Sequence, residues 1–190
     1  MRTRLLAAAA ALSMIAAAPA EAALKTAVFA GGCFWSIEKA FESLPGVTAA
    51  VSGYTGGTRP DPSYENHTGH LEAVRVTYDP AKVSYQALTD FFFRQIDPTD
   101  PNGQFCDQGA SYRTAIFTAD AAEQASATAA KARVAKLLGK PVATEVRAAS
   151  RFWIAESVHQ DFAKKHPVNY NAYRIGCGRD GALKAVWAGR

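Results

Sequence analysis

The sequence predicts an α+β domain with a split β-α-β-β-α-β core, the arrangement called ferredoxin-like, in which helices pack on a mixed or antiparallel sheet. Three observations indicate this class. Segments of alternating polarity and segments of helical period follow one another in that order over residues 24–118. Glycine and proline mark most of the boundaries between them. The chain of 190 residues is long enough for one domain with a sizeable core.

The pattern begins with a strand, a helix and a second strand. Residues 24–30 alternate toward apolar character and end at a glycine pair, as a strand entering a tight turn does. Residues 33–44 place apolar side chains at helical spacing, and a Pro-Gly pair ends that helix. Residues 47–54 alternate again and lead into a polar loop over residues 55–69.

Three further elements complete the predicted core. Residues 71–78 alternate and stop at an Asp-Pro pair, which predicts the third strand. Residues 84–96 form an amphipathic helical pattern that Ser84 can cap. A loop rich in proline, aspartate, asparagine and glycine, residues 97–109, leads to the fourth strand at residues 112–118.

Beyond the core the pattern is weaker. Asp120 opens an alanine-rich helix that ends at about residue 138. A short strand at residues 142–146 and a short helix at residues 157–165 follow. Residues 166–190 contain four glycines, and we expect a largely irregular C-terminal tail there.

Residues 1–22 have the organisation of a secretory signal peptide. Two arginines precede an alanine- and leucine-rich run, and small residues follow at the spacing that signal peptidase requires. The run of about 14 apolar residues is too short to cross a bilayer core of about 30 Å. We therefore expect cleavage of residues 1–22, a single domain over residues 23–190, and an exported, periplasmic protein.

Composition argues against several function classes. The net charge of +4 is too small, and the basic residues too scattered, for nucleic-acid binding. The sequence has no phosphate-cradling glycine motif, nucleotide fingerprint or serine nucleophile elbow. Its four histidines do not stand at zinc-binding spacing with cysteines. We expect no metal, no nucleic acid and, after signal cleavage, no membrane association.

The cysteine count points to thiol chemistry. Cys33, Cys106 and Cys177 are three in number, and an odd count in an exported chain suggests that one of them works as a free thiol. The alternative is one structural disulfide and a buried free cysteine.

Cys33 occupies the predicted strand-to-helix turn, directly after two glycines. The first turn of a helix offers unpaired N–H groups and the positive end of the dipole, which stabilise a thiolate. We therefore expect a lowered thiol pKa at Cys33 and an aromatic wall from Phe34 and Trp35 beside it. The alternative is that Cys33 is a small apolar residue in the core.

The segment Gly31-Gly32-Cys33-Phe34-Trp35 resembles the nucleophile motif of A-type peptide methionine sulfoxide reductases. The resemblance continues in order along the chain through four further segments: Val51-Ser52-Gly53-Tyr54-Thr55-Gly56-Gly57, Tyr64 with Gly69-His70-Leu71-Glu72, Asp107-Gln108-Gly109 with Ser111-Tyr112-Arg113, and Ala155-Glu156 through His159-Gln160. Separated motifs in the right order are far more specific than any one of them.

The resemblance implies that the chain reduces methionine S-sulfoxide, free or in oxidised proteins, as a repair of oxidative damage. It implies that Cys33 attacks the sulfoxide sulfur and becomes a sulfenic acid, and that Glu72 is the general acid in an apolar pocket that raises its pKa. The other implied roles are hydrogen bonds to the sulfoxide oxygen from Tyr64 and Tyr112, a methyl-binding wall of Phe34 and Trp35, and substrate positioning by Asp107.

Without the resemblance these partners have simpler interpretations. Glu72 fits a solvent-facing position of its strand, and Asp107 fits a turn residue. Tyr64 and Tyr112 fit ordinary half-buried aromatic residues.

The resemblance also implies how the enzyme is recycled. Cys177 would resolve the sulfenic acid by forming a disulfide with Cys33. A thioredoxin-like protein, or dithiothreitol, would then reduce that disulfide, with no bound cofactor. Cys106 directly precedes Asp107 and is either a second resolving thiol or a buried spectator, and the spectator role is favoured. We expect a monomer.

Two other functions stay open. A thiol peroxidase or disulfide exchanger could use the same Cys33 and Cys177, although the sequence has no C-x-x-C motif and the aromatic pair suits a methyl group better than a peroxide. A non-catalytic exported binding module would lock its cysteines in a structural disulfide.

Overall fold

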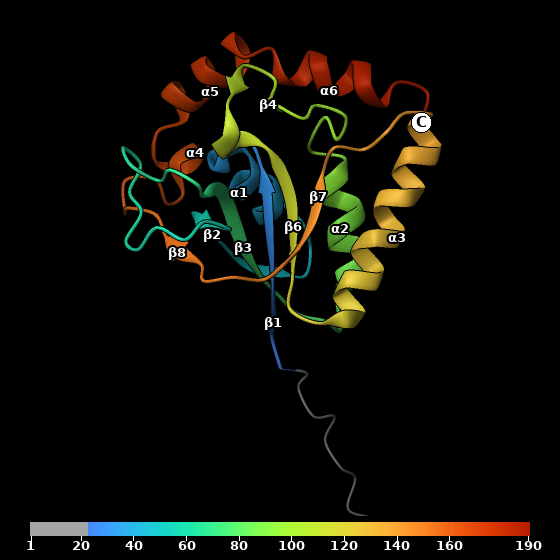
Figure 1. Ribbon diagram of the computed structural model, residues 1–190. Helices are drawn as coiled ribbons and strands as arrows, with labels where there is room; N and C mark the ends of the chain where they lie inside the picture. The colour runs from blue at the N-terminus through green and yellow to red at the C-terminus, as the bar shows by residue number, and fades with distance from the viewer. Residues whose placement is uncertain (1–22) are drawn as a thin grey trace, which may run out of the picture.

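The computed structural model describes residues 23–190, so the predicted signal peptide, residues 1–22, lies outside the described residues. Its main sheet has six strands in the order β7-β6-β1-β3-β2-β8 (Figure 1). The four central strands are β1 (Lys25–Gly31), β2 (Val47–Thr55), β3 (Leu71–Tyr78) and β6 (Thr114–Thr118). They pair antiparallel, and β7 (Glu145–Ala148) joins β6 in parallel. This order confirms the predicted α+β split β-α-β-β-α-β core.

The two crossover helices, α1 (Phe34–Glu42) and α2 (Tyr85–Phe93), cover the same face of the sheet. Phe29 of β1 demonstrates this, because its ring lies 4.9 Å from the ring of Phe41 in α1 and 5.0 Å from that of Phe92 in α2. All three side chains are at most 1 % exposed, so the apolar periodicities of strand and helices meet in one core.

Capping residues fix where two helices begin. Ser84 Oγ accepts the N–H of Ala87 at 3.1 Å and starts α2, as predicted. Asp120 accepts the N–H of Glu123 at 2.8 Å and starts α3 (Ala121–Leu138), which packs against α2. Both caps satisfy backbone donors that the first helical turn leaves free.

The prediction of a largely irregular C-terminal tail is wrong. The tail folds into α4 (Phe162–Lys165), α5 (Pro167–Gly176) and α6 (Arg179–Trp187), and α5 and α6 run across one end of the sheet (Figure 1). Gly178, with φ of 64°, makes the single left-handed break between α5 and α6. Trp187 Nε1 donates to Ile96 O at 3.1 Å and anchors the end of the tail.

Smaller differences concern loops near this end of the sheet. The fourth core strand begins two residues later than predicted, because residues Ala110–Tyr112 form a 3₁₀ turn. The late strand is shifted to Glu145–Ala148, and the late helix begins only at Phe162. Three short strands were not predicted: β4 (Gly103–Gln104), β5 (Asp107–Gln108) and β8 (Trp153–Ile154).

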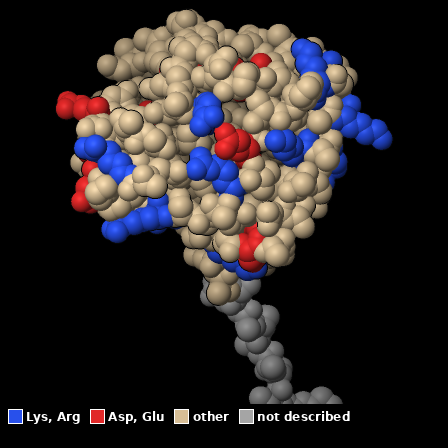
Figure 2. Space-filling model, in the orientation of Figure 1, with Lys and Arg blue, Asp and Glu red and all other residues tan. Residues whose placement is uncertain are grey.

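Charged side chains are spread over the surface in the view of Figure 2, where lysines and arginines alternate with acidic residues among uncharged ones. This distribution agrees with the scattered basic residues of the sequence. None of the helices in residues 23–190 combines the length and the apolar character that a membrane span needs.

Candidate active site

A cavity of about 140 Å³ lies at the N-terminal end of α1. It brings together seven residues that the sequence predicts, and one that it does not, Tyr173. The eight lining residues are Cys33, Phe34, Trp35, Tyr64, Glu72, Asp107, Tyr112 and Tyr173. The site therefore draws on α1, β3, β5, α5, the 3₁₀ turn Ala110–Tyr112 and the loop that carries Tyr64.

The turn from β1 into α1 places Cys33 at the N-cap position of the helix. Gly32 adopts φ of 80°, which favours glycine, and a Cβ there would lie 2.6 Å from Gln104 Cβ. Glu72 lies in β3, the strand that pairs with β1 in the sheet, and its partner in β2 is Tyr54. The glycine pair and the strand register thus set the thiol and the carboxyl near each other.

The thiol of Cys33 is 6 % exposed. Burial, followed by the charge of Glu72, raises its pKa to about 12, although the N–H of Trp35 and the hydroxyl of Tyr173 favour the thiolate. The expected lowering of this pKa is therefore wrong for this form of the protein, because the loss of hydration outweighs the helix N-terminus. Cys33 is a neutral thiol at pH 7.

Glu72 is 1 % exposed, and its Oε2 accepts the N–H of Phe34 at 3.0 Å. Burial raises the pKa of this carboxyl to about 8, against the opposing effect of the Phe34 hydrogen bond. The apolar pocket required of a general acid is therefore present, and the solvent-facing alternative for Glu72 is wrong. At pH 7 the pocket holds a protonated acid beside a protonated thiol.

The aromatic wall is built around Trp35. Its indole stacks on Phe162 with ring centroids 3.8 Å apart, and its Nε1 donates to Nδ1 of His159 at 3.3 Å. Tyr64 closes the rim, with its ring 4.4 Å from that of His159. The backbone N–H of Tyr64 donates to Oε1 of Glu156 at 2.8 Å, so the connection between β8 and α4 holds the loop that carries this tyrosine.

Tyr173 joins the pocket to the tail. Its hydroxyl donates to Oδ2 of Asp107 at 2.5 Å, and its side chain lines the pocket together with Cys33. Burial raises the pKa of the Asp107 carboxyl, while the Tyr173 hydrogen bond and Arg179 oppose that shift. The sequence could have indicated Tyr173 through its spacing from Cys177. The two are four positions apart, which is about one turn of α5, so both side chains lie on the same side of that helix.

The cysteines pair differently from the predicted disulfide between Cys33 and Cys177. Cys106 and Cys177 form a disulfide with Cα atoms 5.0 Å apart, and Cys33 is free and buried. Cys106 is exposed, so its interpretation as a buried spectator is wrong. The pairing arises because the β4–β5 hairpin brings Cys106 beside the C-terminus of α5, where the Cys106 N–H lies 3.1 Å from Cys177 Sγ.

Within residues 23–190, one group of side chains has potential metal-ligand atoms close together, Cys106, Asp107 and Cys177, within 4.8 Å of one another. Both sulfur atoms of this group are engaged in the disulfide.

His70 precedes Leu71 and Glu72 in the chain but contacts the loop before β3. Its Nε2 lies 2.8 Å from the backbone oxygen of Arg59.

Comparison with known proteins places this geometry among methionine sulfoxide reductases. Residues 25–190 match the model of the family described as peptide methionine sulfoxide reductase. The chain is 49 % identical to peptide methionine sulfoxide reductase MsrA 2 of Caulobacter vibrioides over the full length of both. Among solved structures it is similar to methionine sulfoxide reductase A of Corynebacterium diphtheriae, with 32 % identity, a TM-score of 0.72 and 76 % of each chain covered.

A further solved structure is Mxr1 of Saccharomyces cerevisiae in reduced form, with 29 % identity, a TM-score of 0.71, and 82 % of this chain and 91 % of that chain covered. The same yeast protein has also been solved in complex with Trx2.

Proposed function

This chain belongs to the peptide methionine sulfoxide reductase family, and we propose that its buried Cys33–Glu72 pair reduces the S-epimer of methionine sulfoxide, free or in proteins. The chain is an oxidoreductase of methionine sulfoxide. The observation that carries the proposed chemistry is the protonated Glu72 carboxyl in the same 140 Å³ cavity as the free thiol of Cys33.

The reaction needs a nucleophile at sulfur and a proton at the departing oxygen. Cys33 Sγ attacks the sulfoxide sulfur, and Glu72 gives its proton to the oxygen. The thiol proton replaces the one that Glu72 has given up. The sulfoxide sulfur is reduced by two electrons to methionine, and Cys33 is oxidised by two electrons to the sulfenic acid, which retains the oxygen.

The remaining lining residues suit the substrate. Tyr64 and Tyr112 supply hydroxyl donors for the oxygen as negative charge develops on it. Phe34 and Trp35 offer an apolar surface for the S-methyl group. Asp107, held by Tyr173, positions the polar end of the cavity.

Recycling proceeds through the other two cysteines. Cys177 attacks the sulfenic sulfur, releases water and leaves a disulfide with Cys33. Cys106 then attacks Cys177, which frees the Cys33 thiol and forms the Cys106–Cys177 bond. The state described above, with Cys33 free and that bond closed, supports this last step.

An external dithiol completes the cycle by reducing the exposed disulfide. A thioredoxin-like protein suits this role, as the yeast relative's complex with Trx2 suggests, and dithiothreitol can replace it. This scheme needs no bound cofactor. We further propose that residues 1–22 direct export to the periplasm, which fractionation of cells expressing the full chain would test.

The decisive experiment is dithiothreitol-dependent turnover of separated S- and R-epimers of a methionine sulfoxide substrate. We expect the protein to reduce the S-epimer alone and the Cys33→Ser variant to reduce neither. Lack of turnover of both epimers by folded, reduced protein would overturn the proposal. Peroxide and disulfide substrates, tested in parallel, address the two other thiol chemistries.

A further inference from the structure

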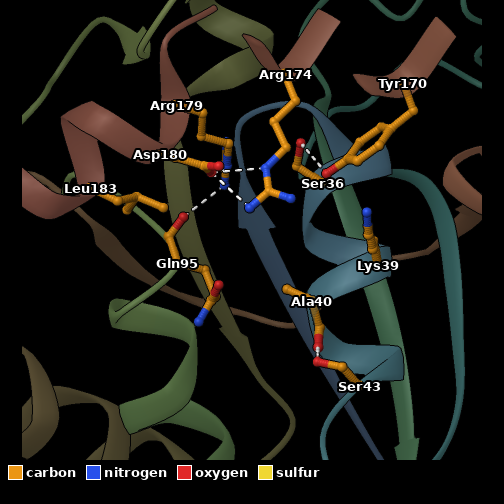
Figure 3. Close-up of a pocket in the computed structure, with 10 residues that line it drawn as sticks. All are labelled: Ser36, Lys39, Ala40, Ser43, Gln95, Tyr170, Arg174, Arg179, Asp180 and Leu183. Atoms are coloured by element: carbon orange, nitrogen blue, oxygen red, sulfur yellow. Dashed lines mark hydrogen bonds and ion pairs between the residues drawn. The ribbon is translucent and has the colours of Figure 1, made fainter. Parts of the chain in front are cut away.

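A second cavity, of about 230 Å³, lies between α1 and the junction of α5 with α6 (Figure 3). It is separate from the catalytic pocket, with which it shares no lining residue. Its walls carry three cationic side chains, Lys39, Arg174 and Arg179, and one anionic side chain, Asp180. An excess of two positive charges therefore gathers in a space that is large enough for a small polyatomic ion.

Arg179 is the buried cation of this site. It is 4 % exposed, its Nη2 donates to Gln95 O at 2.7 Å, and its guanidinium lies 4.8 Å from the ring centroid of Phe105. Its Nη1 is buried and has no hydrogen-bond partner among residues 23–190. A buried donor without an acceptor is costly, and a charged one more so. An anion in the adjoining cavity would offset that cost electrostatically.

Arg174 projects into the same cavity from α5. Its Nε and Nη2 donate to Oδ1 of Asp180 at 2.8 and 2.7 Å, which orients the guanidinium. Figure 3 shows the remaining terminal nitrogen directed away from Asp180, toward the side of the cavity formed by α1. Arg174 therefore has a free donor edge on a side chain that is already held in place.

The opposite wall, on α1, supplies the third cation. Lys39 Nζ lies 4.5 Å from the ring centroid of Tyr170 and makes no ion pair within the described part of the chain. One turn earlier in α1, Ser36 lines the cavity and is bonded to the Tyr170 hydroxyl at 3.4 Å. This wall thus adds an ammonium group and a hydroxyl, which suit a multiply charged oxygen ligand.

We propose that this cavity binds a small phosphate-type dianion, either inorganic phosphate or the phosphate group of a small monoester, between Lys39, Arg174 and Arg179. The excess of two cations over the single carboxylate matches a dianion better than a monovalent carboxylate. Planar guanidinium groups and an ammonium group are the donors that recognise phosphate oxygens in proteins.

The location gives the site a structural consequence. Arg174 and Arg179 flank Cys177 in the chain, whereas Lys39 belongs to the helix whose N-terminus carries Cys33. A bound dianion would therefore hold the cysteine-bearing segment of the tail against α1.

The test is isothermal titration calorimetry of the purified protein with inorganic phosphate and with glycerol phosphate, at constant ionic strength, because exposed charges respond to salt. We expect saturable binding of one anion per chain, weakened about tenfold or more by Arg174→Gln and by Lys39→Gln. Tighter binding of glycerol phosphate would identify a monoester as the ligand, and tighter binding of inorganic phosphate the free ion. The measurement requires no turnover, so it is independent of the proposed catalytic chemistry.

Lys136→Gln is the matched control, because it removes one exposed positive charge from α3, away from the cavity. Its affinity for phosphate should equal that of the unmodified protein. Absence of saturable binding by folded protein, or equal weakening by Lys136→Gln and Arg174→Gln, would overturn the proposal.

Discussion

The backbone N–H of Phe34 donates to Oε2 of Glu72 at 3.0 Å, so the residue directly after the nucleophile holds the proposed acid in place. The hydrogen bond fixes the carboxyl near Cys33, while burial raises its pKa to about 8. Position and protonation state thus have different causes, and a substitution can separate them.

Glu72→Gln keeps an oxygen that can accept the Phe34 N–H but removes the transferable proton. We expect kcat for methionine sulfoxide to fall about 10²- to 10⁴-fold, the usual contribution of a general acid. In the unmodified protein kcat should decline as pH rises through about 8, and the variant should lack that decline. Glu65→Gln, which makes the same chemical change at an exposed position, serves as the control. A variant of undiminished kcat would show that Glu72 is not the acid.

The same substitution should stabilise the fold. The pKa of Glu72 in the folded protein, about 8, lies above that of an unfolded glutamate, so the folded state binds the proton more tightly. Stability is then highest below the unfolded pKa and decreases as pH rises toward 8. We expect Glu72→Gln to gain on the order of 4 kcal/mol at pH 8, with little gain at pH 4. Urea unfolding at both pH values measures this, and equal effects at both would contradict it.

Cys33 should react slowly with alkylating agents at neutral pH. Its burial and the neighbouring Glu72 raise the thiol pKa to about 12, so the thiolate fraction is small. We expect the rate of modification by iodoacetamide to keep increasing above pH 9, where a model thiol of pKa about 8.5 levels off. The Cys106–Cys177 disulfide leaves Cys33 as the reactive thiol of the oxidised protein. A plateau of the rate below pH 8 would contradict this expectation.

The order of the recycling steps predicts which disulfide accumulates after one turnover. Reduced Cys106→Ser protein mixed with one equivalent of substrate should stop at a Cys33–Cys177 bond, whereas the unmodified protein should reach Cys106–Cys177. Cys177→Ser should stop at the Cys33 sulfenic acid. Mass spectrometry of peptides prepared at low pH distinguishes the three products. Formation of the Cys33–Cys106 bond in the unmodified protein would contradict the proposed order.

The core and most of the pocket could be predicted from sequence because their signals are local. The alternation over Leu71–Tyr78 coincides with β3. Seven of the eight residues that line the pocket belong to the sequence motifs described above. The tail could not be predicted in the same way. Its helices depend on distant contacts, such as that of Trp187 with Ile96, and its glycines resemble those of a loop.

The pKa of Cys33 and the pairing of the other two cysteines could not be predicted from the sequence, because they depend on burial and on contacts between distant residues. The pKa of Cys33 follows from how completely the folded chain excludes water, and this effect exceeds that of the helix N-terminus. The Cys106–Cys177 bond joins residues 71 positions apart, through a hairpin too short to have a clear periodicity.

Glu156 provides the last prediction, because it holds the Tyr64 loop without lining the pocket. One carboxylate oxygen accepts the Tyr64 N–H at 2.8 Å, and the other accepts the Tyr54 hydroxyl at 3.0 Å. We expect Glu156→Ala to release the loop and lower kcat about tenfold or more, because the Tyr64 hydroxyl would no longer be fixed at the sulfoxide oxygen.

Glu156→Gln should recover part of that kcat, since an amide oxygen can still accept one of the two hydrogen bonds. In a Tyr64→Phe background, Glu156→Ala should cause little further loss, because both substitutions remove the same hydroxyl from its position. Fully additive losses in kcat would instead show that Glu156 acts on catalysis through another residue, with the Tyr54 hydroxyl as the first group to test.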